Sequence, residues 1–196
     1  MTGVRDSMIA GAARLLAQRG LQATSFSTVL AETQAPRGSI YHHFPGGKEE
    51  LVTAAIEATL QHALSLIYQD MGASAVEVTQ SFLAAWRALL THAHFDAGCA
   101  LVAVTVAAET DTLRQRAAEA FRAWRGKLAR ALEAGGLSER DATATAALLL
   151  AASEGAVVIC RAEQDIGPFE VVAAQLVDHV RALPTAAAGA DTDEEA

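Results

Sequence analysis

A short run of hydrogen-bonding residues is the part of the sequence best suited to chemistry, and it comprises Arg37, Gly38, Ser39, Tyr41 and His42. An arginine guanidinium offers a planar fork of donors to guanine or to phosphate, and serine and tyrosine supply hydroxyl groups. Gly38 would let a polymer backbone approach closely because it has no side chain. The run therefore predicts contact with the phosphates and base edges of DNA.

Charge is divided unevenly along the chain. Residues 1–48 carry five basic and two acidic side chains, whereas the rest carries ten basic and 21 acidic ones, so the formal net charge of -8 conceals a basic head. Lys48 lies near the start of a predicted helix, where free backbone N–H groups already attract phosphate. Binding responds to the local field rather than to net charge, so the head remains a candidate for a polyanion partner.

The composition predicts an all-α protein. Ala accounts for 45 of 196 residues and favours helices over strands, while 4 Pro and 14 Gly leave few places for breaks. Apolar spacing and capping residues predict helices at about residues 4–19, 26–33, 36–43, 48–69, 74–93, 98–109, 111–134, 138–163 and 168–183.

The first three of these helices are expected to fold together. Helices of about eight residues joined by a short turn cannot bury much separately, so the second and third should cross on the first as a helix-turn-helix. The positions expected to face inward are Leu15, Leu16, Phe26, Val29, Leu30, Ala35, Ile40 and Phe44. The polar run at 37–42 then faces outward.

Two segments of the head, Ala23–Leu30 and Pro36–Leu51, resemble the DNA-binding domain of TetR-type repressors. The double glycine before Lys48, with Gly98-Cys99 and the apolar run after it, resembles the LmrA/YxaF-like branch. By this resemblance the DNA-contacting positions are Arg37, Ser39, Tyr41, His42 and Lys48, and those near the DNA backbone are Thr24, Ser25 and Thr28.

Gln34 departs from the family pattern, which usually has Gly at this position of the turn. If the residue is left-handed, glutamine costs about 1 kcal/mol there. The turn is therefore expected to differ slightly from that of the family.

The histidines also have plainer interpretations. His43, next to Phe44, is expected to pack in the turn, whereas phosphate contact is favoured for His42. His92, His94 and Asp96 have a spacing that suggests a metal cluster. Residues two apart on a helix point to different sides, and no Glu-x-x-His motif accompanies them. A loop at a helix end is therefore expected, with no metal and no cofactor.

The helix at about 141–163 is apolar nearly all round, more than one packed side requires. The surplus implies a second partner, and the helix after Pro168 offers a matching stripe. By the resemblance, these two helices and their twofold mates form the four-helix interface of a homodimer. The expected interface residues are Ala147, Ala151, Val158, Val172, Leu176 and Val180.

An effector site is expected where the long helix after Lys48 meets the body, because an effector must favour one spacing of the two heads. The apolar helix at 99–107 is the expected wall. Charge is scarce there, so a small hydrophobic effector is expected, with polar contacts from His62 or Glu154. The candidates are His62, Trp86, Leu90, Cys99, Val102, Phe121, Trp124 and Glu154. The alternative is that the aromatic residues are ordinary core.

The expected organisation is a DNA-binding domain at 1–48, a helical effector-binding and dimerisation domain at 49–183, and a disordered acidic tail at 184–196. The function expected is a ligand-responsive transcriptional regulator, a repressor that binds a palindromic operator in double-stranded DNA. A helical-bundle enzyme or small-molecule carrier with an incidental helix-turn-helix is the alternative. No catalytic constellation is recognisable in the sequence.

A cytoplasmic location without membrane association is expected. The first residues lack the apolar core of a signal peptide. Cys99 and Cys160 have no CxxC spacing, which favours small buried residues in a reducing compartment over a disulfide. Residues 142–160 are nearly uncharged, but Glu154 would be costly to insert in a bilayer, so a helix buried in protein is expected.

Overall fold

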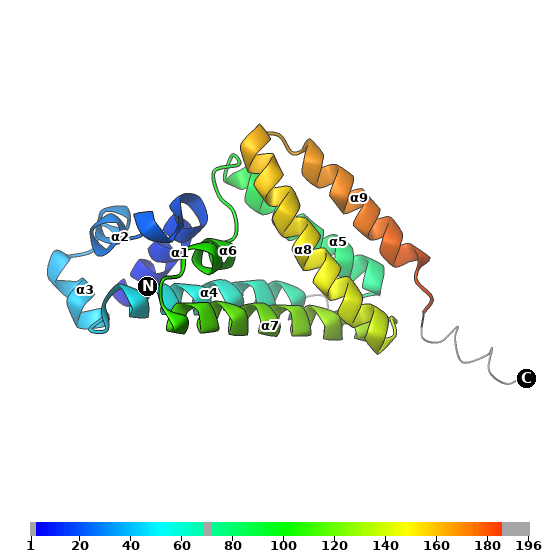
Figure 1. The fold of residues 1–196 in the computed structure, drawn as a ribbon, viewed down its shortest axis with the longest axis horizontal. Coiled ribbons are helices and arrows are strands. Elements are labelled where there is room, and N and C mark those ends of the chain that lie inside the picture. The colour runs from blue at the N-terminus through cyan, green and yellow to red at the C-terminus, as the bar shows by residue number, and fades with distance from the viewer. Residues whose placement is uncertain (1–2, 69–71, 186–196) are drawn as a thin grey trace, which may run out of the picture. The chain divides into compact units, whose positions relative to one another are not determined.

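The computed structural model describes residues 3–68 and 72–185, and the secondary structure in these ranges is α-helical (Figure 1). The prediction of an all-α fold is therefore confirmed. The helices are α1 (Val4–Ala23), α2 (Phe26–Thr33), α3 (Arg37–His43), α4 (Gly47–Tyr68), α5 (Ala75–His92), α6 (Ala100–Ala107), α7 (Asp111–Ala134), α8 (Glu139–Glu163) and α9 (Gly167–Ala182). Each predicted helix is present, with ends displaced by a few residues. Most of the expected acidic tail lies outside the described residues.

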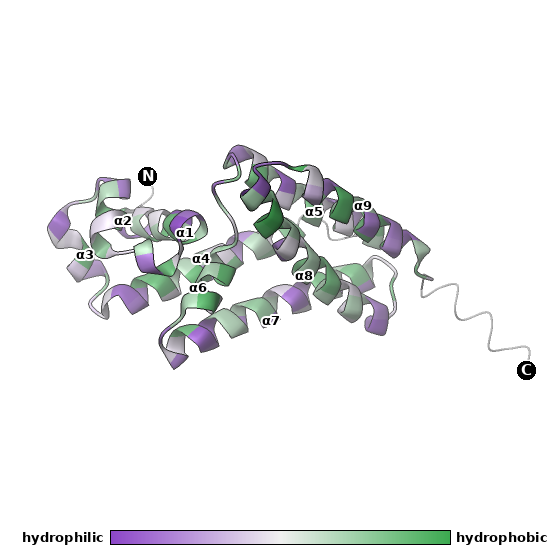
Figure 2. Ribbon diagram, turned by 45° about the horizontal axis from the view of Figure 1, so that its top comes forward, coloured by the Kyte–Doolittle hydropathy of each residue, from purple (hydrophilic) through white to green (hydrophobic). Residues whose placement is uncertain are grey.

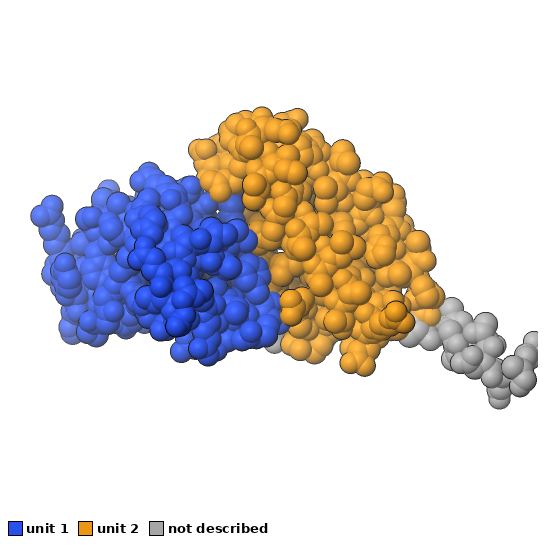
Figure 3. Space-filling view, in the orientation of Figure 1, with its two compact units in different colours: residues 1–62, 97–122 blue, residues 63–96, 123–196 orange. Residues whose placement is uncertain are grey.

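The chain divides into two compact units (Figure 3). Unit 1 comprises residues 1–62 and 97–122, and unit 2 comprises residues 63–96 and 123–196. The predicted boundary at residue 48 does not coincide with this division. Unit 1 also contains α6, which packs on α1, and the first parts of α4 and α7.

The first helix of unit 1 is interrupted at Gly20, which has φ 78° and ψ 179°. Glycine adopts this backbone region without the steric penalty that a Cβ would bring. The predicted helix ends at about residue 19, but a further short turn continues to Ala23. The Thr24 hydroxyl donates to the Gly20 carbonyl oxygen at 2.9 Å and closes the kink.

Helix α6 packs along α1 within unit 1 and is held at both ends. The backbone N–H of Gly98 donates to the Ala17 carbonyl oxygen at 2.9 Å. Beyond the other end of α6, the side-chain amide of Gln22 donates to the Glu109 carboxylate at 2.8 Å. Ala100, Leu101 and Val104 are buried. The short apolar helix is therefore part of the core that supports α1.

Unit 2 is built around α5, α8 and α9, each of which packs against the other two. Ser74 caps α5 in a capping box with Glu77, and Ser138 caps α8. Hydrophobic residues run along much of α8 (Figure 2). This helix is long and apolar enough to cross a membrane, but Ala146, Leu149 and other residues of one face are buried in unit 2. It packs as a core helix, as predicted.

Candidate nucleic-acid interface

The start of α2 is fixed by a reciprocal pair of hydrogen bonds. The Ser25 hydroxyl accepts from the Thr28 backbone N–H at 3.2 Å, and the Thr28 hydroxyl accepts from the Ser25 backbone N–H at 2.8 Å. Ser25 is thus the N-cap of α2. Thr24 is only 1% exposed, so its hydroxyl has no surface to offer DNA. In this structure the hydroxyl serves the kink, and the position of Thr24 near the DNA backbone stays a prediction.

The turn between α2 and α3 places Gln34 in the left-handed region, with φ 54° and ψ 25°. Gln34 is therefore left-handed, which is the case in which glutamine costs about 1 kcal/mol at this position. Pro36 is the N-cap of α3 rather than a residue of its first turn, with φ -61° and ψ 134°. The Ser39 hydroxyl donates to the Pro36 carbonyl oxygen at 2.6 Å, which commits that hydroxyl to the start of the helix.

The outward face of α3 carries the predicted donors. Arg37, Gly38 and His42 are exposed, and Tyr41 is 70% exposed. Nothing lies within 4 Å of the position that a Cβ on Gly38 would occupy, so the surface there is open. This face combines a guanidinium, a phenol and an imidazole on one short helix.

The inner face of the helix-turn-helix is formed largely as predicted. Val29, Ile40 and Phe44 are buried, as are Leu15 and Leu16 on α1. The other three positions expected to face inward are only half-buried, and they are Phe26, Leu30 and Ala35. Phe26 lies at the start of α2, where its ring packs edge-on against Tyr41 with centroids 5.4 Å apart. The ring of Phe26 therefore braces an exposed residue of α3.

Lys48 lies half-buried near the start of α4, where its ammonium donates to the Leu21 carbonyl oxygen at 2.7 Å. This bond joins the end of α1 to the start of α4. The sequence assigned Lys48 only to DNA contact, and spacing alone gave no signal for its hydrogen bond to α1.

Comparison with known proteins defines the family of this chain. Residues 8–55 match the model of bacterial regulatory proteins of the tetR family, and residues 75–175 match that of the C-terminal domain of LmrA/YxaF-like transcriptional regulators. The chain belongs to the TetR family of transcriptional regulators. It is therefore a DNA-binding regulator with a helix-turn-helix, from a family of regulators rather than enzymes.

Two curated TetR-family relatives extend over most of the chain. An uncharacterized HTH-type transcriptional regulator of Mycobacterium tuberculosis is 34% identical over 90% of this chain and 93% of its own length. The uncharacterized regulator YxaF of Bacillus subtilis is 30% identical over 90% of this chain and 95% of its own. A TetR regulator from Legionella pneumophila shares the fold, with a TM-score of 0.79 and 22% identity over 91% of this chain and 98% of its own.

The expected effector residues are distributed over both units. Unit 1 contains His62, Cys99, Val102 and Phe121, and unit 2 contains Trp86, Leu90, Trp124 and Glu154. In unit 2, Trp86 and Trp124 stack with centroids 5.9 Å apart and an interplanar angle of 27°. Both are buried, at 6% and 7% exposure. The structure therefore brings this predicted pair together.

Phe82 completes an aromatic cluster with the two tryptophans, and it was not among the effector residues predicted from the sequence. Its ring centroid lies 6.5 Å from Trp86 and 6.2 Å from Trp124. Its spacing of four residues before Trp86 places both rings on one face of α5 and could have revealed it. We call Phe82, Trp86 and Trp124 the aromatic cluster.

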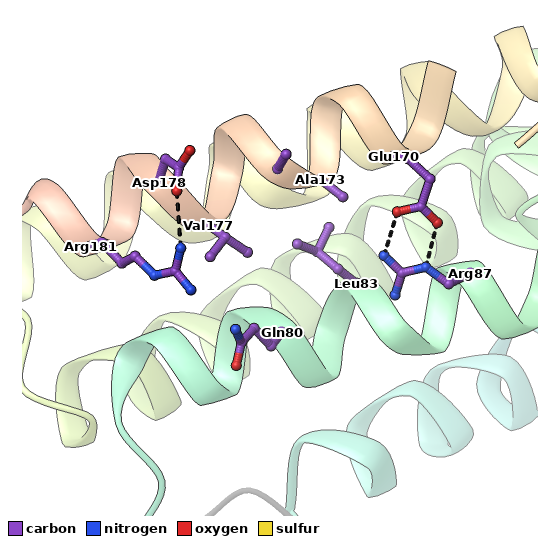
Figure 4. A pocket seen from close by; sticks show the side chains of 9 residues that line it. Gln80, Leu83, Arg87, Glu170, Ala173, Val177, Asp178 and Arg181 are labelled. Carbon is purple, nitrogen blue, oxygen red and sulfur yellow. Dashed lines mark hydrogen bonds and ion pairs between the residues drawn. The ribbon is translucent and has the colours of Figure 1, made fainter. Parts of the chain in front are cut away.

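Unit 2 also contains an open groove of about 400 Å³ between α5 and α9 (Figure 4). It is lined by Gln80, Leu83, Arg87, Glu170, Ala173, Ala174, Val177, Asp178 and Arg181, none of which was among the predicted effector residues. Arg87 donates two hydrogen bonds, of 2.5 and 2.7 Å, to the Glu170 carboxylate. This guanidinium holds the pKa of Glu170 below its usual range, chiefly through the side-chain hydrogen bond.

The exposed face of α8 carries three of the predicted interface residues, Ala147, Ala151 and Val158. Leu148 and Ile159 extend this apolar stripe, at 43% and 46% exposure. The predicted residues of α9 behave differently. Leu176 and Val180 are only 5% and 3% exposed, and Val172 is half-buried.

The apolar stripe predicted on α9 is therefore used inside the chain, where α9 packs on α5 and α8. Leu176 and Val180 therefore have little surface left for a second chain, and their place in an interface stays a prediction. The exposed large apolar residue of α9 is instead Val171, at 67% exposure, and the sequence pattern did not distinguish it.

The histidines after α5 form a turn, as predicted. The helix ends at His92, and His94 and Phe95 adopt positive φ values of 48° and 61°. Within the described parts of the chain, no group of three or more His, Cys, Asp or Glu side chains could hold a metal ion. Cys99 is half-buried, Cys160 is buried, and the two are not joined by a disulfide.

Proposed function

We propose that this TetR-family regulator is a cytoplasmic repressor that binds a palindromic operator as a homodimer and leaves it when a small hydrophobic effector binds. The observation that carries the proposal is the exposed donor face of α3, supported by the buried core of the helix-turn-helix. One such face reads few bases, so two copies are needed for a specific site. Their half-sites should lie in successive major grooves, about 34–36 Å apart or a multiple of this.

Operator binding is tested by footprinting and gel shift on DNA upstream of the protein's own gene. An inverted repeat is expected. Arg37→Ala should weaken specific binding by roughly 1–3 kcal/mol if the guanidinium reads a base. Wild-type affinity in this variant, with its circular dichroism spectrum intact, would remove Arg37 from the interface.

The dimer proposal is supported by the exposed apolar stripe on α8, because such a stripe is unfavourable in water unless a partner covers it. Ala151→Glu places a charge within the stripe and should give monomers that no longer bind the operator. Ala84→Glu is the matched control, since Ala84 is an equally small exposed residue of α5. Sedimentation of both variants distinguishes the outcomes. Wild-type protein that sediments as a monomer at micromolar concentration contradicts the proposal.

We place the effector in unit 2 beside the aromatic cluster. Two buried hydroxyl groups on α8, which packs against α5 in the same unit, support this choice. Thr145 Oγ1 and Ser153 Oγ are buried and have no hydrogen-bond partner in the described structure. Thr79, by contrast, donates to the carbonyl oxygen four residues earlier at 2.8 Å. A ligand with a hydrogen-bonding group would satisfy hydroxyls that are otherwise costly to bury.

The chain's two tryptophans both belong to this cluster, so an effector that binds beside them should alter tryptophan fluorescence. A screen of hydrophobic compounds by fluorescence, followed by release of operator DNA, tests the site. Ser153→Ala should leave folding and operator binding intact and weaken the response to the effector. If Trp86→Ala and Trp124→Ala merely unfold the protein and Ser153→Ala responds normally, the aromatic cluster is ordinary core.

A further inference from the structure

Arg5 lies in the first turn of α1, and its guanidinium carbon is 5.3 Å from the centroid of the Phe44 ring. Phe44 is the C-cap residue of α3 and is fully buried. Its backbone N–H donates to the Ile40 carbonyl oxygen at 2.8 Å, and its own carbonyl oxygen accepts from the Gly47 N–H at 3.0 Å. The ring is thus fixed in the turn after α3, and it holds the exposed Arg5 at that end of the helix.

The guanidinium of Arg5 has different surroundings from the charged groups of Arg14 and Lys48, two other basic residues of the head. Arg14 pairs with the Glu32 carboxylate at 3.4 Å, and the Lys48 ammonium donates to a backbone carbonyl. Arg5 takes part in none of the ion pairs found among the described residues. A guanidinium attracted to the face of a ring still has N–H donors in its fork for another acceptor.

Arg5 and Arg37 lie at opposite ends of α3. A helix of seven residues is about 10 Å long, and the major groove of DNA is about 12 Å wide. Guanidinium groups at the two ends of a helix that occupies the groove can therefore each reach phosphates along the edges of the groove. Arginine suits such contacts because its donor fork matches the phosphate oxygens.

We propose that Arg5 is a DNA-phosphate contact that α1 supplies and Phe44 positions at the C-terminal end of α3. This inference rests on the proposed DNA-binding function and adds a residue to it. A phosphate contact stabilises specific and non-specific complexes alike, and it carries no base preference. Its signature is therefore the salt dependence of binding rather than sequence discrimination.

The test measures the affinity of the full-length protein for a random-sequence duplex and for the footprinted upstream fragment over a range of salt concentrations. Arg5→Ala should weaken binding to both duplexes by the same factor. It should also reduce the slope of log affinity against log salt by about 0.9 for each bound head. Arg5→Lys should keep most of the slope because it keeps the charge.

Two further variants keep the test decisive. Arg5→Met retains an unbranched stem over Phe44 without the charge, and it should lose the same slope as Arg5→Ala. Arg19→Ala is the matched control, because Arg19 is an exposed arginine near the other end of α1. It should bind DNA as the wild type does.

A purely structural role for Arg5 predicts a different result. Arg5→Ala would then lower the melting temperature while Arg5→Met kept the wild-type slope, and this outcome overturns the proposal. If the wild-type protein itself shows no salt-dependent binding to either duplex, the proposed function fails. If the wild-type protein binds both duplexes and the salt slopes of Arg5→Ala and Arg5→Met equal the wild-type slope, the phosphate contact by Arg5 is excluded and the DNA-binding function stands.

Discussion

The Lys48 ammonium donates a hydrogen bond of 2.7 Å to the backbone carbonyl oxygen of Leu21. Leu21 follows the kink at Gly20, and its carbonyl oxygen also accepts from the Thr24 backbone N–H at 3.3 Å. A side chain from α4 therefore completes the end of α1. The same residue that the family resemblance assigns to DNA also stabilises the fold that presents α3.

Lys48→Met tests this double role. The variant keeps an unbranched apolar stem but leaves the Leu21 carbonyl without its charged donor. We expect the free energy of unfolding to fall by about 1 kcal/mol, the usual contribution of a partly buried hydrogen bond. Urea denaturation measures this loss, and DNA titration at low salt measures the loss of charge. Unchanged stability would show that the bond to Leu21 contributes nothing to the fold.

The Arg87–Glu170 pair predicts a pH-dependent contribution to stability. Because the hydrogen bond from Arg87 lowers the pKa of Glu170 in the folded state, the pair stabilises the protein above the unfolded pKa of glutamate, about 4.3. This contribution is lost as the pH falls through the folded pKa. Glu170→Gln should reduce stability at pH 7 by up to about 1 kcal/mol, since exposed pairs contribute little.

The difference between Glu170→Gln and wild type should therefore shrink on acidification, which urea midpoints over a pH series would show. Asp178→Asn is the control, because it removes an ion pair on the same helix whose partners are 64% and 56% exposed. A constant difference at every pH would rule out titration of Glu170 as its cause.

The left-handed Gln34 predicts a stabilising substitution. Gln34→Gly removes the Cβ that makes φ 54° unfavourable, so the free energy of unfolding should rise by about 1 kcal/mol. Thermal denaturation measures this gain. Gln115→Gly is the contrasting control in the second turn of α7, where the same change should destabilise by about 1 kcal/mol. Equal effects at both positions would contradict the backbone argument.

A close approach at the end of α7 predicts a destabilising substitution. A Cβ on Gly135 would lie 2.8 Å from the Ser74 carbonyl carbon and closer still to the Ala75 nitrogen, and backbone atoms cannot rotate away. Gly135→Ala should destabilise unit 2 by about 1–3 kcal/mol.

Gly126→Ala is the matched control in the interior of α7. There the nearest atom to a new Cβ is a flexible arginine nitrogen, Arg130 Nη1, at 3.6 Å. The control should stabilise by about 0.5–1 kcal/mol through helix propensity. Urea denaturation of the pair measures both effects, and a tolerated Gly135→Ala would show that α5 can shift away.

The local features of the fold were predictable from sequence because short-range chemistry determines them. Ser25, Ser74 and Ser138 begin their helices as their capping patterns predict, and Gly135 follows the end of α7. The donors of α3 were equally predictable from the sequence, since an eight-residue amphipathic segment has only one polar face to present.

Packing between helices remote in the sequence could not be predicted in the same way. Periodicity finds an apolar stripe on α9, but it does not say whether Leu176 packs inside the chain or against a second copy. The bond between Lys48 and Leu21 and the ring contact of Arg5 with Phe44 both join elements that are remote in sequence. Residue spacing carries no information about either.

The attachment of α6 to α1 has a consequence for how the protein is made. The Gln22–Glu109 hydrogen bond joins residues 87 positions apart. At a synthesis rate of about 5–20 residues per second, α1 is on the order of ten seconds old before this partner is translated. Isolated helical domains fold in milliseconds or less, so the helix-turn-helix must form first with one side of α1 still uncovered. A nascent chain that stalls before residue 100 would expose that side to chaperones or to proteolysis.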